Sequence, residues 1–305
     1  MSALTAIINP LTSEKATKKV YLYWSHPTDH AIQYEQRVLG AGRSPAIGDS
    51  KKTAKLSNPS TLVSLVMDDT LRVYGVEDKT NQICLLVPLH DPIPGSFAKH
   101  GYIAGLTVPA RTPEDQDEGY VYFQVTDTEH KTTSIKQQIL SNTTKVATPT
   151  AASDIIKDSW LAALYDGKNR WVIYQKSTKV IYMLNTSSGA NQEIPLESHN
   201  IIARAQAQIA AVYVAGPVEA GVPTGTFFVY FTDADHRLWR TSANRTNPSF
   251  STPTPVSSAA GLKILSDAQI TITADRATKR NFIYTTLEDG DNIISTLRDD
   301  WVYES

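Results

Sequence analysis

This chain of 305 residues lacks most features that would place it in a specialised class of protein. Its one cysteine, Cys84, cannot form a disulfide within the chain, and we expect it to fill the core as a small apolar side chain. No apolar run reaches the ~18 residues of a membrane-spanning helix. The net charge of −2 gives no reason to expect nucleic acid or an anionic membrane as a partner.

The common signatures of enzymes are also missing. We find no glycine-rich nucleotide loop, no zinc-protease helix motif and no serine-hydrolase elbow. His26 and His30 have the i,i+4 spacing of a metal pair, but Pro27 disfavours the helix that this spacing requires. We therefore predict no metal and no cofactor.

A secretory leader is not recognisable after Met1. The expected compartment is the cytoplasm if Met1 is the native start, and the secretory pathway if a leader has been removed. Three glycosylation sequons follow strand hairpins; they begin at Asn142, Asn185 and Asn244. They are candidate glycan sites only in a secreted chain.

A sustained helical period is absent too, so we expect very little helix. What recurs, about every 50 residues, is a short run of β-branched and aromatic residues that ends in tyrosine, as is typical of β-propeller blades. Its six copies are Lys19–Tyr21, Leu71–Tyr74, Tyr120–Tyr122, Val172–Tyr174, Phe228–Tyr230 and Phe282–Tyr284.

Each tyrosine-ended run is followed by a polar turn and a second strand, which together indicate a hairpin. Small-residue strands such as Leu161–Tyr165 and Ile209–Tyr213 precede the hairpins and suit the crowded axis of a ring. We predict an all-β fold: one six-bladed β-propeller domain over residues 1–305, with four-stranded antiparallel blades and ragged outer strands. Residues 1–17 should supply a strand that closes the ring.

This layout resembles that of the fungal fucose-specific lectins, which are six-bladed propellers of about this length. Blades of that family carry Arg before a Val–Tyr pair, as in Leu71–Tyr74, and the Arg works with a Glu on the following strand and a Trp or Tyr from the next blade. The Arg position reads Lys19, Arg72, Tyr120, Val172, Phe228 and Phe282. The Glu position reads Tyr34, Leu85, Gln137, Met183, Arg240 and Thr296. No blade has the Arg–Glu pair.

A lectin-like propeller without its sugar-clamping pair is similar to the fungal hetero-Diels–Alderases of tropolone sesquiterpenoid biosynthesis. The resemblance implies a cofactor-free pericyclase that joins an o-quinone methide to a terpene alkene. Such catalysis needs two apolar partners held in one orientation, and a donor that polarises the heterodiene oxygen.

The candidate catalytic donors are Arg72, Lys176, Lys279 and Arg280. The candidate substrate-binding aromatics are Tyr23, Trp24, Trp171, Phe228, Trp239, Phe282 and Trp301. Each aromatic could instead pack between blades, and each cation could lie on a solvated edge.

Two other functions stay open: a carbohydrate-binding lectin with degenerate sites, and an interaction propeller without a small ligand. The expected partner is an apolar small molecule, or a fucosylated glycan in the lectin alternative. The oligomeric state is left open, a homodimer included. If a sugar site survives, we expect it at Arg72, with at most millimolar affinity for fucose and complete loss in Arg72→Ala.

Overall fold

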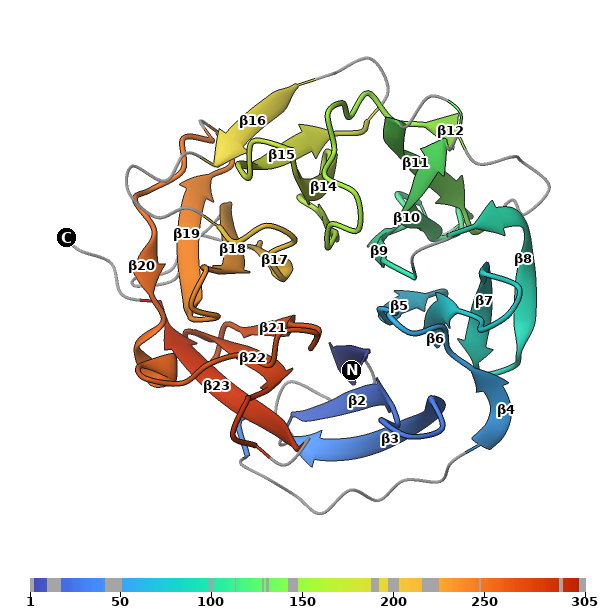
Figure 1. The fold of residues 1–305 in the computed structure, drawn as a ribbon, viewed down its shortest axis with the longest axis horizontal. Coiled ribbons are helices and arrows are strands. Elements are labelled where there is room, and N and C mark those ends of the chain that lie inside the picture. Colours follow the sequence, from blue (N-terminus) through green and yellow to red (C-terminus); the bar gives the residue numbers. More distant parts are fainter. Residues whose placement is uncertain are drawn as a thin grey trace.

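The computed structural model describes residues 3–9, 18–41, 51–98, 101–112, 114–127, 129, 132–141, 148–187, 192–196, 203–215, 225–246, 248–290 and 293–301. These residues form six antiparallel sheets that follow one another around a common centre (Figure 1). The single helical element in this part of the chain is the short 3-10 turn η1 (Ser257–Ala259). The prediction of an all-β fold with very little helix is confirmed.

In the first half of the chain, the strands of each sheet run in chain order from the centre outward. The first sheet contains β1 (Leu4–Ile8), β2 (Lys19–Ser25), β3 (Ala31–Val38) and β4 (Lys51–Lys55). The second contains β5 (Val63–Met67), β6 (Thr70–Val76), β7 (Gln82–Val87) and β8 (Asp91–Phe97). The third contains β9 (Ile103–Val108), β10 (Glu118–Asp127), β11 (Thr132–Ile139) and β12 (Thr148–Pro149).

The second half repeats this order. The fourth sheet contains β13 (Ala162–Tyr165), β14 (Arg170–Gln175), β15 (Ile181–Asn185) and β16 (Glu193–Leu196). The fifth contains β17 (Ile209–Val214), β18 (Thr226–Thr232), β19 (Leu238–Asn244) and β20 (Thr254–Pro255). The sixth contains β21 (Thr271–Asp275), β22 (Arg280–Thr286) and β23 (Ile294–Asp300).

All six tyrosine-ended runs form the second strand of a sheet. The outer strands are ragged as expected, since β12 and β20 have two residues each. Four strands per sheet holds for five sheets, whereas the described part of the sixth sheet has three. None of the described residues forms a helix with the length and hydropathy that a bilayer crossing requires.

The innermost strands line a central cavity of about 160 Å³. Small residues such as Gly105, Ala163 and Ala211 stand where these strands converge. A Cβ on Gly105 would come within 2.6 Å of Val63 Cγ1, so the packing there requires glycine. The small-residue strands therefore surround the axis, as predicted, but the cavity is smaller than the ~300 Å³ of a typical small-molecule site.

Side chains close the ring between its first and last sheets. The carboxamide Oε1 of Gln269, just before β21, accepts from the backbone N–H of Leu4 (2.9 Å) and of Leu62 (2.8 Å). Gln269 Nε2 also donates to the Leu62 carbonyl at 2.9 Å. A second link is the ion pair of Lys18 with Asp275 (2.6 Å). The N-terminal residues thus do supply a strand, β1, which is the innermost strand of the first sheet.

Candidate functional site

Neighbouring sheets pack face to face, and one apolar cluster fills each junction. Because side chains alternate along a strand, one face of each second strand points to the next sheet and the other to the preceding sheet. Tyr122 of the third sheet and Tyr174 of the fourth lie in the same cluster. Tyr122 therefore points to the following sheet, whereas Tyr174 points to the preceding one. The two tyrosines do not occupy equivalent positions in the repeat.

The strand pairing shows where the lectin-like positions lie. The Glu position stands opposite the motif tyrosine in Tyr122↔Gln137 and Tyr230↔Arg240. In the first sheet, however, Tyr34 stands opposite Tyr23, and in the fourth sheet Met183 stands opposite Ile173.

The lectin Arg position lies on the second strand, two residues before the residue that stands opposite the Glu position. It is therefore Tyr21 rather than Lys19 in the first sheet, and Trp171 rather than Val172 in the fourth. Tyr21 and Trp171 indeed lie in clusters with the following sheet. This corrects the alignment made on the tyrosines.

With this correction, the position that the lectin resemblance assigns to Arg carries an aromatic ring in five of six sheets. The six residues are Tyr21, Arg72, Tyr120, Trp171, Phe228 and Phe282. Four of these rings are at most 5% exposed and fill the junctions between sheets. Only Arg72 keeps the charge. Leu85 stands opposite Tyr74 on the same hairpin, and the carboxylate paired with Arg72 is Asp68, at 3.9 Å.

The structure spreads the candidate aromatics over four junctions between sheets. Tyr23 packs between the first and second sheets, and Trp24 with Phe282 between the sixth and first. Trp171 and Trp239 lie between the fourth and fifth. Phe228 and Trp301 stack between the fifth and sixth, with ring centroids 6.2 Å apart and planes at 12°.

The candidate donors lie in three different sheets and do not converge. Arg72 belongs to the second sheet and pairs with Asp68 at 3.9 Å. Lys176 of the fourth sheet pairs with Glu193 at 2.6 Å and lies 4.2 Å from the Tyr182 ring. Arg280 of the sixth sheet pairs with Asp300 at 2.9 Å, and Lys279 occupies the turn before it.

The junction between the fifth and sixth sheets gathers a cation and a carboxylate from different sheets beside stacked aromatic rings. We call it the Arg240 site: Phe228, Tyr230 and Arg240 from the fifth sheet, and Asn281, Asp299 and Trp301 from the sixth. Arg240 Nη1 donates to both carboxylate oxygens of Asp299, at 2.9 and 3.0 Å. The Tyr230 hydroxyl donates to Asp299 Oδ2 at 2.5 Å and accepts from Asn281 Nδ2 at 2.7 Å.

The electrostatics of the Arg240 site keep the tyrosine neutral. Burial, reinforced by the charge of Asp299, raises the pKa of Tyr230 well above its ordinary value. The Arg240 side chain remains 20% exposed, which leaves the guanidinium open to solvent. Within the described part of the chain, its Nη2 has only a long contact of 3.4 Å, with Thr254 Oγ1.

Two buried polar atoms of the Arg240 site have no hydrogen-bond partner among the described residues: the indole Nε1 of Trp301 and the carboxamide Oδ1 of Asn281. Unsatisfied buried polar atoms are uncommon in native proteins and point to a water or ligand partner. The site therefore contains one buried donor and one buried acceptor without a partner, beneath the partly exposed guanidinium of Arg240.

Comparison with known proteins gives matches by structure only, since no family model and no curated protein matches. A mutant of Aleuria aurantia lectin, in complex with alpha-methyl-L-fucoside, superposes with a TM-score of 0.66 at 16% identity, over 100% of this chain and 97% of that chain. The protein AofleA from Arthrobotrys oligospora gives 0.65 at 10% identity, over 97% of this chain and 82% of that chain. This chain has the fold of the fungal fucose lectins.

The lectin fold is itself described as a six-bladed β-propeller in another structure of the Aleuria aurantia protein, which matches with a TM-score of 0.64 at 16% identity over the whole of this chain. On this scaffold the present chain has aromatic rings at five of the six expected Arg positions, and its Arg240 occupies a Glu position. The likeness therefore establishes the fold, and the ligand has to be argued from the side chains.

Two of the three sequons lie on described residues of the lectin-like fold. Asn185 ends β15, is 5% exposed, and accepts a hydrogen bond from Ser187 N. Asn244 is exposed, and its Oδ1 accepts from Thr246. Asn142 lies outside the described residues. Of these two asparagines, Asn244 is the one whose side chain is accessible for glycan attachment.

Proposed function

We propose that this chain binds a small carbohydrate at the Arg240 site. The observation that carries the proposal is the Arg240–Asp299 pair beside Trp301. It brings together the cation, carboxylate and aromatic ring that the fucose-lectin resemblance implies, with the charges exchanged. Here the cation stands on the third strand, and the carboxylate comes from the following sheet.

The expected affinity is low, because both oxygens of Asp299 are already engaged by Arg240 and Tyr230. A ligand hydroxyl would accept from Arg240 Nη2, which is partly exposed. Trp301 Nε1 and Asn281 Oδ1 are buried, and a ligand would reach them only by opening the junction. Few charge-assisted bonds, each contributing about 1.5–3 kcal/mol, correspond to binding in the millimolar range.

Titration of the full chain with methyl fucoside and a panel of other monosaccharides, followed by NMR, tests the proposal. Arg240→Ala should weaken binding by about 10- to 100-fold, because one or more charge-assisted bonds are lost. Arg237→Ala is the matched control, since Arg237 is 58% exposed and pairs with Asp235 on the surface. Absence of binding by the wild type, or equal binding by folded Arg240→Ala, would contradict the proposal.

The same titration examines Arg72, which alone keeps the lectin cation. Without a Glu on the following strand, we expect at most millimolar fucose affinity there, lost in Arg72→Ala. Micromolar affinity at Arg72 would favour a true fucose lectin.

A second candidate is the cofactor-free cycloaddition of an o-quinone methide with a terpene alkene. The aromatic rings at five of the six lectin cation positions favour it, because they replace the cation of a sugar site with apolar side chains. Arg72, Lys176 and Arg280 remain its proposed donors. The central cavity of about 160 Å³ is too small for two such partners, so the reaction would take place between sheets.

Incubation with a quinone-methide precursor and humulene, with chiral analysis of the products, tests this candidate. An enzyme should give one stereoisomer in excess over the uncatalysed mixture, because binding fixes the relative orientation of the partners. A product mixture identical to that of a protein-free control would count against it.

A further inference from the structure

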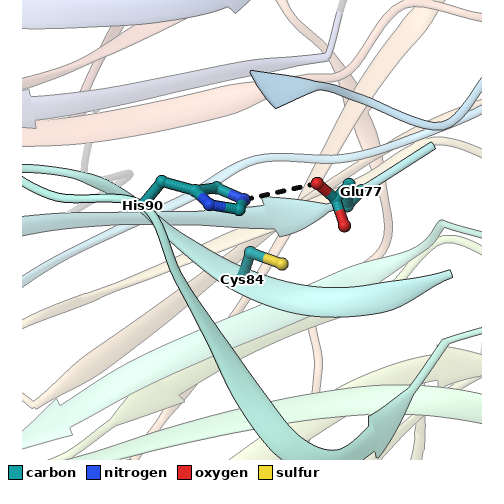
Figure 2. Close-up of side chains that lie close together, drawn as sticks. All are labelled: Glu77, Cys84 and His90. Atoms are coloured by element: carbon teal, nitrogen blue, oxygen red, sulfur yellow. Dashed lines mark ion pairs between the residues drawn. The ribbon is translucent and has the colours of Figure 1, made fainter. Parts of the chain in front are cut away.

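Three potential metal ligands meet in the second sheet, away from the Arg240 site. Glu77 follows β6, Cys84 lies within β7, and His90 occupies the turn between β7 and β8 (Figure 2). Their ligand atoms all lie within 4.8 Å of one another. His90 Nε2 is 3.4 Å from Glu77 Oε1.

The strand pairing brings these residues together. Glu77 N donates to the Gln82 carbonyl at 2.9 Å, which folds the turn after β6 back onto β7. Leu85 stands opposite Asp91, so the next turn carries His90 back beside the same part of β7. The turn after β6, strand β7 and the turn before β8 therefore hold the three side chains in place.

Neighbouring groups orient the cluster. Thr80 Oγ1 donates to Glu77 Oε2 at 2.9 Å, which leaves Oε1 directed at His90. Cys84 is fully buried, and its thiol makes one weak contact, at 3.6 Å with the Gln82 carbonyl. The Glu77 and His90 side chains are 24% and 29% exposed, so an ion can enter from solvent.

The charge around the thiol is negative. Burial, together with the carboxylates of Glu77 and Asp91, raises the pKa of Cys84 to about 12. A cation at the centre of the cluster would be attracted by both carboxylates and would relieve the penalty on a thiolate.

We propose that Glu77, Cys84 and His90 bind a zinc ion. One sulfur, one nitrogen and one oxygen ligand form a donor set that zinc accepts in tetrahedral geometry. Metal–ligand bonds of about 2.0–2.3 Å place the ligand atoms about 3.4–3.6 Å apart. The pair of His90 with Glu77 already has this separation, and small side-chain rotations would bring Cys84 to it. Binding expels the thiol proton to solvent, and water takes the fourth position.

Cobalt titration of the chelator-treated full chain tests the proposal, because Co²⁺ substitutes for zinc and reports thiolate ligation by its ultraviolet charge-transfer band. We expect one equivalent to bind with this band, zinc to displace it, and zinc to raise the midpoint of thermal unfolding. His90→Gln and Glu77→Gln should each weaken binding by about 100-fold or more, since loss of a second-shell partner alone costs 10- to 100-fold.

His26→Gln is the matched control, because His26 also lies in a turn and pairs with a carboxylate, Asp29 at 3.1 Å, but has no cysteine nearby. It should bind cobalt as the wild type does. Cys84→Ser should abolish the band, and the partly exposed His90 provides an independent readout if that core variant fails to fold. Absence of the charge-transfer band, or unchanged affinity in His90→Gln, would overturn the proposal.

Discussion

At the scale of single residues, Tyr230 holds the Arg240 site together. Its hydroxyl contacts both Asp299 and Asn281, which belong to the next sheet. The hydroxyl is fully buried and neutral, so it can donate to the carboxylate while accepting from the carboxamide.

Tyr230→Phe should lower the free energy of unfolding by about 1–3 kcal/mol, because it leaves Asn281 Nδ2 buried without its acceptor. Denaturant unfolding measures the change. Tyr34→Phe is the control, since Tyr34 is 41% exposed and should change stability little. Equal effects of the two substitutions would show that the Tyr230 hydroxyl has no special role.

Sequence reasoning selected two residues of this site, Phe228 and Trp301, as candidate binding aromatics, and noted Arg240 only as the residue at a lectin Glu position. Phe228, Arg240 and Trp301 could be selected because they stand at repeat positions or carry a large aromatic ring. Asp299 could not be paired with Arg240, because the two lie 59 residues apart and meet only when two sheets pack together. The sequence analysis missed the cluster of Glu77, Cys84 and His90 for a similar reason. Their spacing in the sequence does not indicate that two turns and a strand bring these side chains together.

At the scale of the strand, the pattern of β-branched and aromatic residues predicted all six second strands. The exact register of these strands was harder to predict, since a shift of one residue moves every side chain to the opposite face of the sheet. In the fourth sheet Val172 and Tyr174 look like the repeated motif but face the preceding sheet, while Trp171 and Ile173 face the following one. The apolar composition of both faces hides this difference from the sequence.

The junction of β21 with the first sheet should respond to acid. Burial would raise the pKa of Asp275, but hydrogen bonds from Lys18 (2.6 Å) and Thr278 (2.7 Å) outweigh it and hold the pKa below 3.8. Because the folded-state pKa is lowered, this stabilisation is present above pH 3.8 and is lost as the pH falls below it.

Asp275→Asn should therefore lower the free energy of unfolding by about 1.5–3 kcal/mol at neutral pH, and by less near pH 3. Unfolding measured across this pH range checks the trend. Asp235→Asn, on a side chain 64% exposed, serves as the control. A deficit that stays constant with pH would rule out the ionised carboxylate as its cause.

At the scale of the whole molecule, one carboxamide connects three sheets. Gln269 of the sixth sheet bonds the backbone of Leu4 in the first and of Leu62 before the second. Gln269 and Leu62 line the central cavity, where the innermost strands converge.

Gln269→Leu should destabilise the chain by about 2–5 kcal/mol, because two backbone N–H groups near the axis lose their acceptor. Thermal and denaturant unfolding measure the loss. Gln206→Leu is the matched control, since the bond from Gln206 to the Lys157 carbonyl is exposed. If both variants unfold alike, the ring does not depend on this bridge.

The position of Gln269 also orders events during synthesis of the chain. Leu4 is synthesised 265 residues before its hydrogen-bond acceptor. Until that glutamine emerges, the N–H of Leu4 has to be satisfied by water or by another protein, although β1 can already pair with β2. The sheet that contains β1 is thus completed only when the sixth sheet is made, and a nascent chain halted before residue 269 would leave its inner edge exposed.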